Sequence, residues 1–300
     1  MRKILAQTYA LRQGAFGHVV VQELADDLVT HSHPQTQFSF WLGGGRCEAH
    51  LGNVLVKYGE HVALGTNAYE SHDARLLDKG LPAVFLVLYI EKIWWEQRRS
   101  NHGQSFFFPT PEISLSPGLR QACWRLLDAV ISPHIGTPDQ LEIQVESLIE
   151  LAMGSGLTFT KNLRPLSHVP LIDHRLRAAI AHMRAHAAGP ISVEDMAGRV
   201  GLSRAHFFAM FRDQLNTTPQ VFWSAVRVEE VVRRLMCRDE PLTSVAFELG
   251  FSSPGNFSRF FKEHMGVSPS TFRRVASTRN LNPSTGITTA NLDSAFRLSE

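Results

Sequence analysis

Two stretches near the C-terminus combine phenylalanines at helical spacing with side chains that can form hydrogen bonds. Phe207 and Phe211 lie four residues apart in the first stretch, and Phe257 and Phe261 do the same in the second, where Phe260 is expected to be buried with them. Residues at this spacing share one face of a helix, which leaves the opposite face free for polar contacts. A guanidinium on that face can pair with two acceptor atoms of a guanine at once. The chemistry available here is therefore recognition of a base edge.

Both stretches belong to an internal repeat. One copy runs over residues 193–222 and the other over residues 242–272. Alanine and glycine match at an offset of 49 residues, and the later phenylalanines and prolines match at an offset of 50. The matched pairs are Ala197 with Ala246, Gly201 with Gly250, Phe207 with Phe257, Phe211 with Phe261, and Pro219 with Pro269. One extra residue therefore follows the second glycine.

Each matched position has a mechanical reason. A small alanine lets a second helix cross closely, and a glycine accepts the positive φ of a tight turn between helices. A serine can then cap the next helix, and a proline suits the first position of the helix after that. These residues are Gly201, Gly250, Ser203, Ser253, Pro219 and Pro269. The sequence contains this order of elements twice: a helix, a glycine turn, a capped helix and a new helix. It therefore predicts two helix-turn-helix units.

A single unit of this kind is also an ordinary packing arrangement, so one copy favours DNA binding and simple packing about equally. Two copies joined by a long helix, from Pro219 to about Met236, favour DNA binding. Recognition helices ~34 Å apart would enter successive major-groove segments on one face of B-DNA. A structural helical adaptor remains an alternative, and it predicts no salt-dependent affinity for DNA.

Residues 170–275 resemble the DNA-binding domain of the AraC/XylS family of bacterial regulators. The second copy carries most of the likeness, in VAFELGF at 245–251, NFSRFFK at 256–262 and GVSPSTFR at 266–273. Arg227, followed by Val231 and Leu235, resembles the helix that connects the two units in this family. The resemblance implies a monomeric seven-helix domain that reads about two major-groove turns, typically upstream of promoters.

In the first unit we expect DNA contacts from residues opposite the phenylalanines and near the start of the helix. They are Arg204, Ala205, His206, Phe208, Ala209 and Arg212. Phe208 and Ala209 stand where the family more often has polar or basic side chains, so contact with thymine methyl groups is expected in place of hydrogen bonds. Packing of Phe208 on another helix or on the N-terminal domain is an equal alternative.

In the second unit the expected DNA-binding residues are Ser253, Gly255, Asn256, Ser258, Arg259 and Lys262. Arg259 is the best candidate for reading a guanine, and its alternative role is a phosphate contact that positions the protein without specifying sequence. Lys262 is expected to face a phosphate. Arg227, Arg234 and Arg273 are expected to contact the DNA backbone or to form salt bridges.

The N-terminal half consists of short β-favouring runs broken by glycine and asparagine, at 17–23, 37–42, 46–51, 53–56 and 83–90. Closely spaced short strands predict a small barrel or jelly roll. His31, His33, Gln37, a glycine cluster at 43–45, Gly59 and His72 resemble the cupin-like sensor domain common in the same family.

Cupins can bind a divalent metal through two histidines, a carboxylate and a third histidine. Gln37 stands where the carboxylate is expected, so we favour a metal-free ligand pocket of His31, His33, Gln37 and His72, with no cofactor. The histidines could also simply satisfy backbone groups at a polar barrel mouth. The alternative function is a metal-dependent cupin enzyme with a helical appendage. His182 and His186, one turn apart with no third ligand in view, are interpreted as a solvated face.

Two amphipathic patterns follow the strands, one at 119–130 and one at 141–152. Such helices either pack back onto the barrel or pair with a second subunit, and the resemblance favours a homodimer. We expect a two-domain α+β chain: a cupin-like sensing and dimerisation domain at 1–153, a linker at 154–169, a double helix-turn-helix domain at 170–276 joined by a long helix, and a disordered tail at 277–300.

Composition sets the remaining expectations. Residues 170–275 hold 14 Lys and Arg against 10 Asp and Glu, while residues 1–169 hold 14 against 16, so a polyanion should meet the C-terminal half. The three cysteines lie far apart, and no apolar run is long enough for a membrane span or a signal peptide. We expect a cytoplasmic, non-enzymatic bacterial regulator, associated with the nucleoid when bound to DNA. It would be a ligand-responsive activator with a small-molecule effector, promoter DNA and RNA polymerase as partners.

Overall fold

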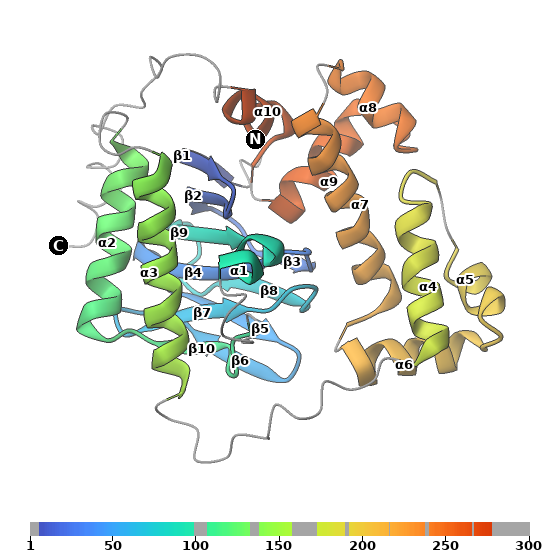
Figure 1. Ribbon diagram of the computed structural model, residues 1–300, viewed down its shortest axis with the longest axis horizontal. Coiled ribbons are helices and arrows are strands. Elements are labelled where there is room, and N and C mark those ends of the chain that lie inside the picture. Colours follow the sequence, from blue (N-terminus) through green and yellow to red (C-terminus); the bar gives the residue numbers. More distant parts are fainter. Residues whose placement is uncertain are drawn as a thin grey trace.

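The computed structural model describes residues 6–98, 107–132, 138–157, 173–189, 192–215, 217–237, 240–265 and 267–277. Within these ranges an N-terminal domain of two antiparallel sheets lies beside a C-terminal domain of helices (Figure 1). The expected two-domain α+β architecture is confirmed. None of the described helices is long and apolar enough to cross a membrane.

The larger sheet has six strands and the smaller has four, and every pairing is antiparallel. In spatial order the larger sheet contains β1 (Ala6–Gly14), β2 (Gly17–Leu24), β9 (Ala83–Ile90), β4 (Thr36–Gly44), β7 (Val62–Thr66) and β10 (Glu112–Ser114). The smaller contains β3 (Leu28–His31), β8 (His72–Leu76), β5 (Cys47–Leu51) and β6 (Val54–Lys57). The strands predicted from sequence correspond to β2, β4, β5, β6 and β9.

Strand β9 is apolar along its whole length because both of its faces are covered. Leu86 and Leu88 belong to a core that includes helices of the N-terminal domain. Phe85 and Val87 belong to a second core, on the other face of the sheet. Successive strand residues point to opposite faces, so a strand buried on both sides shows no polar alternation.

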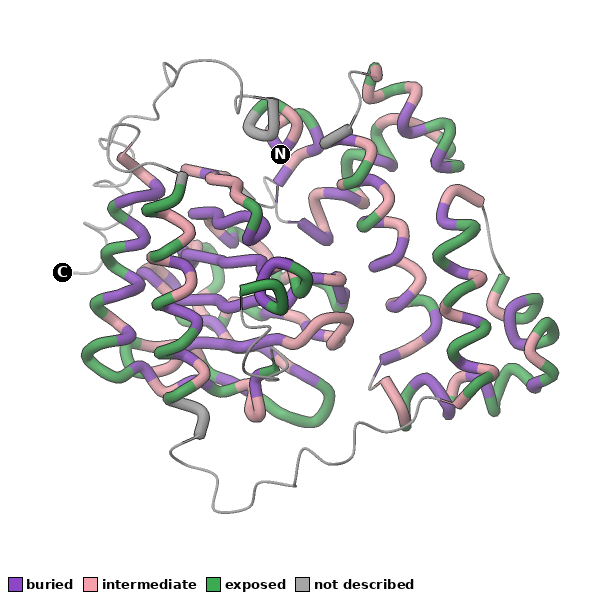
Figure 2. The backbone as a smooth tube through the Cα atoms, viewed as in Figure 1, coloured by how far each residue is buried: buried purple, intermediate pink, exposed green. Residues whose placement is uncertain are grey.

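Three helices belong to the N-terminal domain: α1 (Lys92–Arg98), α2 (Pro117–Ile131) and α3 (Pro138–Leu157). α2 and α3 pack against each other and against the larger sheet. Their predicted apolar stripes lie in the first core, and Figure 2 shows buried residues following the strands and the two helices. Residues 154–157, assigned to the linker by sequence, form the end of α3. Residues 158–169 of that linker lie outside the described residues, and so does the predicted tail at 277–300 except for Ser277, which is the last residue of a helix.

The C-terminal domain has two helix-turn-helix units. The helices are α4 (His174–Ala185), α5 (Val193–Arg199), α6 (Arg204–Leu215), α7 (Pro219–Cys237), α8 (Leu242–Glu248), α9 (Pro254–Met265) and α10 (Pro269–Ser277). α5 and α6 form the first unit, α8 and α9 form the second, and α7 connects them. Each unit has its own group of buried phenylalanines.

The turns of both units follow the sequence prediction. Gly201 has a φ of 69° and Gly250 a φ of 72°. Ser203 Oγ accepts a hydrogen bond from the backbone of His206 at 3.3 Å, and Ser253 Oγ accepts one from Asn256 at 3.1 Å. The serine caps and the left-handed glycines therefore start each recognition helix as expected.

The phenylalanine faces need one correction. Phe207, Phe211, Phe257 and Phe261 are fully buried, but Phe260, expected in the core, is only half-buried. Its ring lies at the edge of the core beside His264 of the same helix, with ring centroids 4.3 Å apart. Phe260 still packs against the second core, and the Arg227 guanidinium lies 5.4 Å from the centre of its ring.

The second unit packs on the N-terminal domain. The second core is continuous from the sheet into this unit, and the Phe272 ring of α10 meets the His18 ring of β2 edge-on at 5.6 Å. α7 and α9 both contact β3. The first unit has its own core, against which one residue of the N-terminal domain, Tyr69, packs.

Candidate nucleic-acid interface and histidine cluster

The first recognition helix, α6, presents most of its predicted residues to solvent. Arg204, Ala205, His206, Ala209 and Arg212 are exposed and Phe208 is half-buried. Arg204 is already engaged, because its Nη1 lies 2.8 Å from a carboxylate oxygen of Glu194 in α5 and its guanidinium lies 5.5 Å from the centre of the Phe208 ring. The outer face of α6 thus combines Phe208 and the small Ala205 and Ala209 with three basic or polar side chains, Arg204, His206 and Arg212.

The second recognition helix, α9, presents a more polar face. Gly255, Asn256, Ser258 and Arg259 are exposed, while Ser253 and Lys262 are half-buried. Ser253 is occupied as the helix cap, and Asn256 Nδ2 donates to Ser252 Oγ at 2.7 Å. Within the described parts of the chain, no carboxylate forms an ion pair with Arg259.

The three other arginines serve the fold. Arg227 Nη2 donates to the carbonyl of Leu249 at 2.7 Å, and Arg273 donates to the carbonyl of Glu240. Arg234 forms ion pairs with Glu230 and Glu248. Of the roles expected for these arginines, the structure shows the salt bridge for Arg234, whereas Arg227 and Arg273 hold backbone carbonyls.

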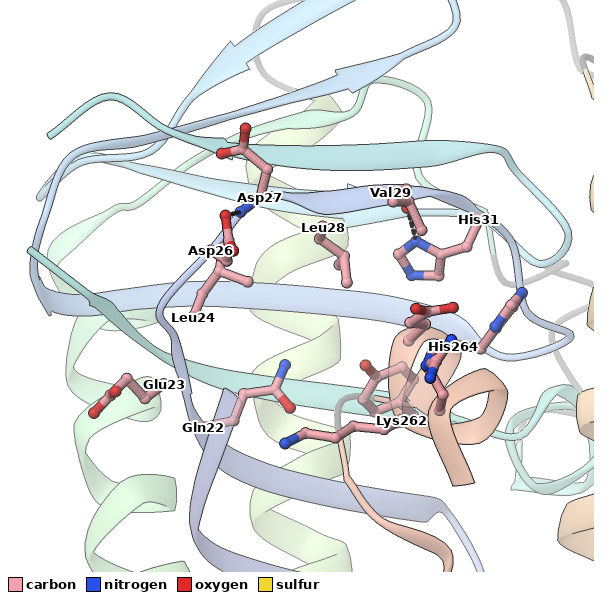
Figure 3. Close-up of a pocket in the computed structure, with 13 residues that line it drawn as sticks. Gln22, Glu23, Leu24, Asp26, Asp27, Leu28, Val29, His31, Lys262 and His264 are labelled. Atoms are coloured by element: carbon pink, nitrogen blue, oxygen red, sulfur yellow. Dashed lines mark hydrogen bonds between the residues drawn. The ribbon is translucent and has the colours of Figure 1, made fainter. Parts of the chain in front are cut away.

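A pocket lies where β2 and β3 meet α9 (Figure 3). Its strand side carries the carboxylates of Glu23, Asp26 and Asp27, and its helix side carries Arg259 and Lys262. Figure 3 shows the Lys262 side chain reaching along the pocket toward Gln22. Lys262 therefore lines the boundary between the domains in this arrangement.

Three of the predicted pocket residues form a buried cluster. His31, His33 and His72 each offer a ring nitrogen, and these three atoms lie within 4.8 Å of one another. Gln37 joins them, since its Oε1 lies 2.6 Å from His33 Nε2. Sequence reasoning therefore named four residues that the fold brings together, although only His31 lines the pocket beside α9.

The cluster is electrically neutral. Burial lowers the pKa of His33 to about 3 and that of His72 to about 4. Burial, reinforced by the neighbouring histidines, also lowers the pKa of His31 well below its usual value. Neutral imidazole is the form that binds metals, and sets of imidazoles suit Zn, Fe, Cu and Ni.

The donor set fits a metal ion in spite of the missing carboxylate. His72 Nε2 is buried and has no hydrogen-bond partner among the described residues. Gln37 provides an amide oxygen where cupins have a charged group. Three imidazoles with an orphaned nitrogen among them could hold a divalent transition metal, which would act there as a Lewis acid or as a structural link.

Sequence reasoning missed a fourth histidine. His264 of α9 lies beside the cluster, with its ring centroid 6.0 Å from that of His31. No spacing signal could have found it, because it lies 192 residues beyond His72 in the sequence, in the other domain.

Comparison with known proteins decides what the C-terminal domain is. Residues 196–275 match the family model described as a helix-turn-helix domain. The C-terminal domain is a helix-turn-helix domain of the AraC type. The predicted family resemblance is thereby confirmed for this domain.

Relatives of this AraC-type domain are regulators by name. The chain is 31% identical over 156 residues to the probable thc operon regulatory protein of Rhodococcus erythropolis, which covers 49% of this chain and 47% of that one. It is 27% identical over 96 residues to the raffinose operon transcriptional regulatory protein RafR of Pediococcus pentosaceus. That match covers 32% of this chain and 35% of RafR. The chain thus spans between a third and a half of these relatives.

A loose likeness extends over the whole chain. ToxT from Vibrio cholerae O395 matches over 92% of this chain and 99% of its own, at 13% identity and a TM-score of 0.48. That likeness is too distant to transfer any property from one protein to the other. The two operon regulators are transcription regulators by name, and neither match supports the alternative of a metal-dependent cupin enzyme.

Proposed function

We propose that the chain is a sequence-specific DNA-binding transcription regulator whose two AraC-type units read successive major-groove segments. The observation that carries this proposal is the pair of capped recognition helices, α6 and α9, at opposite ends of one connecting helix, each with its outer face largely exposed. Both units need a rigid connection to enter two grooves at a fixed separation, and α7 supplies it.

The two units divide the work of recognition. α9 supplies Arg259, a side chain able to pair with both acceptor atoms of a guanine in the major groove. α6 offers Phe208 and Ala209, which suit thymine methyl groups, while Arg212 is placed for a phosphate. Specificity for hydrogen-bonding patterns therefore comes mainly from the second unit.

A small-molecule effector would act at the boundary between the domains. α9 contributes Arg259 and Lys262 to the pocket, so a ligand there competes with DNA for these side chains or shifts the helix. The domains would have one arrangement that binds DNA and one that does not. A ligand changes the DNA affinity only to the extent that its affinities for these two arrangements differ. Activation through RNA polymerase, a homodimer and a bacterial cytoplasmic location stay predictions.

Selection of bound sequences from a random DNA pool tests the proposal, followed by affinities of the selected site over a salt series. We expect an enriched motif of about two helical turns and a linear fall of log K with log salt. Arg259→Ala should relax the preference at one base pair by ~1–3 kcal/mol, or about 5- to 150-fold in discrimination.

Arg177→Ala is the matched control, because Arg177 is an exposed arginine on α4, outside both recognition helices. It should leave both the motif and the discrimination unchanged. The proposal fails if selection enriches no motif and the remaining binding disappears with salt.

A further inference from the structure

The inner side of α9 carries a histidine that recognition of DNA does not use. His264 is 8% exposed. The 6.0 Å between the ring centroids of His264 and His31 equals the separation of His31 and His33. Figure 3 shows His31 and His264 reaching the same end of the pocket, one from β3 and the other from α9. The second recognition helix thus adds an imidazole to the histidine cluster of the N-terminal domain.

All four imidazoles are oriented in the same way. In each of them Nδ1 lies 2.8 or 2.9 Å from a backbone carbonyl oxygen. The pairs are His31 with Val29, His33 with Gln35, His72 with Glu70 and His264 with Phe260. A carbonyl only accepts hydrogen bonds, so each Nδ1 carries the proton and each Nε2 keeps a lone pair. Metal-ligating histidines are held by this kind of second contact.

Two of the Nε2 lone pairs in the cluster have no hydrogen-bond donor within the described residues. His72 Nε2 is buried without a partner, and His33 Nε2 faces Gln37 Oε1, which is also an acceptor. Rotating the Gln37 amide would give His33 a donor and would still leave His72 without one. A cation among the rings would satisfy them together.

We propose that a divalent transition-metal ion binds His31, His33 and His72 and takes His264 of α9 as its fourth ligand, so that it ties the second recognition helix to the N-terminal domain. Four imidazole nitrogens suit Zn²⁺ or an ion of similar preference. With four protein ligands the ion has no open position for water, and closed sites of this kind are structural and not catalytic.

Ligation would change the position of α9. His264 is outside the tight trio of ring nitrogens, so binding draws the C-terminal turn of α9 toward β3 and β8. Arg259 lies on the same helix and moves with it. Metal binding and DNA binding are then linked. A bound metal changes the affinity for DNA by the same factor as bound DNA changes the affinity for the metal. This link rests on the proposed function, whereas metal binding itself does not.

Titration of the metal-stripped full chain with Co²⁺ tests the site, because four-coordinate Co²⁺ absorbs visible light far more strongly than six-coordinate Co²⁺. We expect one ion per chain with strong absorption. His264→Gln, which keeps most of the side-chain volume, should weaken Co²⁺ binding by at least the ~10–100-fold typical of a lost supporting contact and should reduce the absorption. His72→Gln should abolish binding.

His182→Ala is the control, because half-buried His182 of α4 and exposed His186, which caps that helix, form a pair outside the cluster, with ring centroids 4.0 Å apart. It should leave affinity and absorption unchanged. Circular dichroism of every variant before titration establishes that it is folded. The proposal is overturned if the wild type binds no Co²⁺, if a folded His264→Gln variant binds it with unchanged affinity and absorption, or if binding is lost in His182→Ala instead.

The link to DNA has a separate readout. Stripping the metal should change the affinity of the wild type for its selected DNA site and should have no effect in His264→Gln. If the chain binds Co²⁺ through His264 but selects no DNA motif, the metal site stands and the proposed function fails.

Discussion

At the scale of single residues, the two turn glycines occupy equivalent positions in the repeat but differ in how closely other residues approach them. Both adopt positive φ, which costs a residue with a Cβ ~1–2 kcal/mol. A Cβ at Gly250 would also lie 2.9 Å from the carbonyl oxygen of Ala188, whereas a Cβ at Gly201 would meet nothing within 4 Å. The repeat alone treats the two positions as equivalent.

We therefore expect Gly250→Ala to destabilise the C-terminal domain more than Gly201→Ala. Gly201→Ala should cost ~1–2 kcal/mol from backbone strain alone. Gly250→Ala should exceed that because the backbone carbonyl of Ala188 must also move. Urea unfolding followed by circular dichroism measures both. Equal losses would mean that the close approach to Ala188 has no energetic weight.

At the scale of elements, Arg227 holds the connecting helix α7 to the end of α8. Its guanidinium donates to the Leu249 carbonyl and lies 4.1 Å from the centre of the Phe251 ring. A carbonyl at a helix end lacks a partner inside the helix, so this contact satisfies a group that would otherwise lose its hydrogen bond. The planar guanidinium makes the hydrogen bond and the ring contact together, which a lysine ammonium does not.

Arg227→Lys should consequently lower the free energy of unfolding by about 1.5–3 kcal/mol, the range for a hydrogen bond to a charged group. Arg233→Lys is the control on the same helix, because Arg233 is exposed and forms an ion pair with Glu230. An exposed pair contributes at most ~1 kcal/mol. Thermal unfolding distinguishes the variants, and similar losses for both would refute the structural role of Arg227.

At the scale of the whole molecule, Tyr69 joins the N-terminal domain to the first helix-turn-helix unit. Among the residues described, it is the one non-glycine with positive φ, at 62°. Its ring stacks on Phe222 with centroids 4.8 Å apart, and its hydroxyl accepts from Arg184 and donates to Glu229. Burial, together with Glu229, raises the pKa of this hydroxyl to about 12. A strained backbone position that makes this many contacts between domains is maintained by them.

Removal of the Tyr69 ring should weaken the coupling between the domains. Tyr69→Ala keeps a Cβ, and thus the backbone strain, but loses the stacking and both hydrogen bonds, an expected loss of ~2 kcal/mol. Tyr69→Phe keeps the ring and should lose about 1 kcal/mol. Calorimetry of the full chain is the measurement: we expect the Ala variant to unfold in two separated transitions. An unchanged single transition would show that Tyr69 does not couple the domains.

The sequence by itself determined the local features of the C-terminal domain. The glycine turns, the serine caps and most of the buried phenylalanines are set within a few residues of chain, where backbone sterics and capping act. The β-favouring run at 83–90 likewise predicted a strand, now β9, which shows no polar alternation because both of its faces are buried. The family resemblance rested on these same local patterns.

Only the tertiary structure decided which distant groups meet. Arg227 and Arg273 read as DNA or salt-bridge residues in sequence, yet they hold backbone carbonyls that the folding of the helices brings near. His264 shows the same point more strongly. Its place beside His31 depends on how one domain packs on the other. Packing between distant segments produces no periodic pattern in the sequence, so the sequence could not predict this contact.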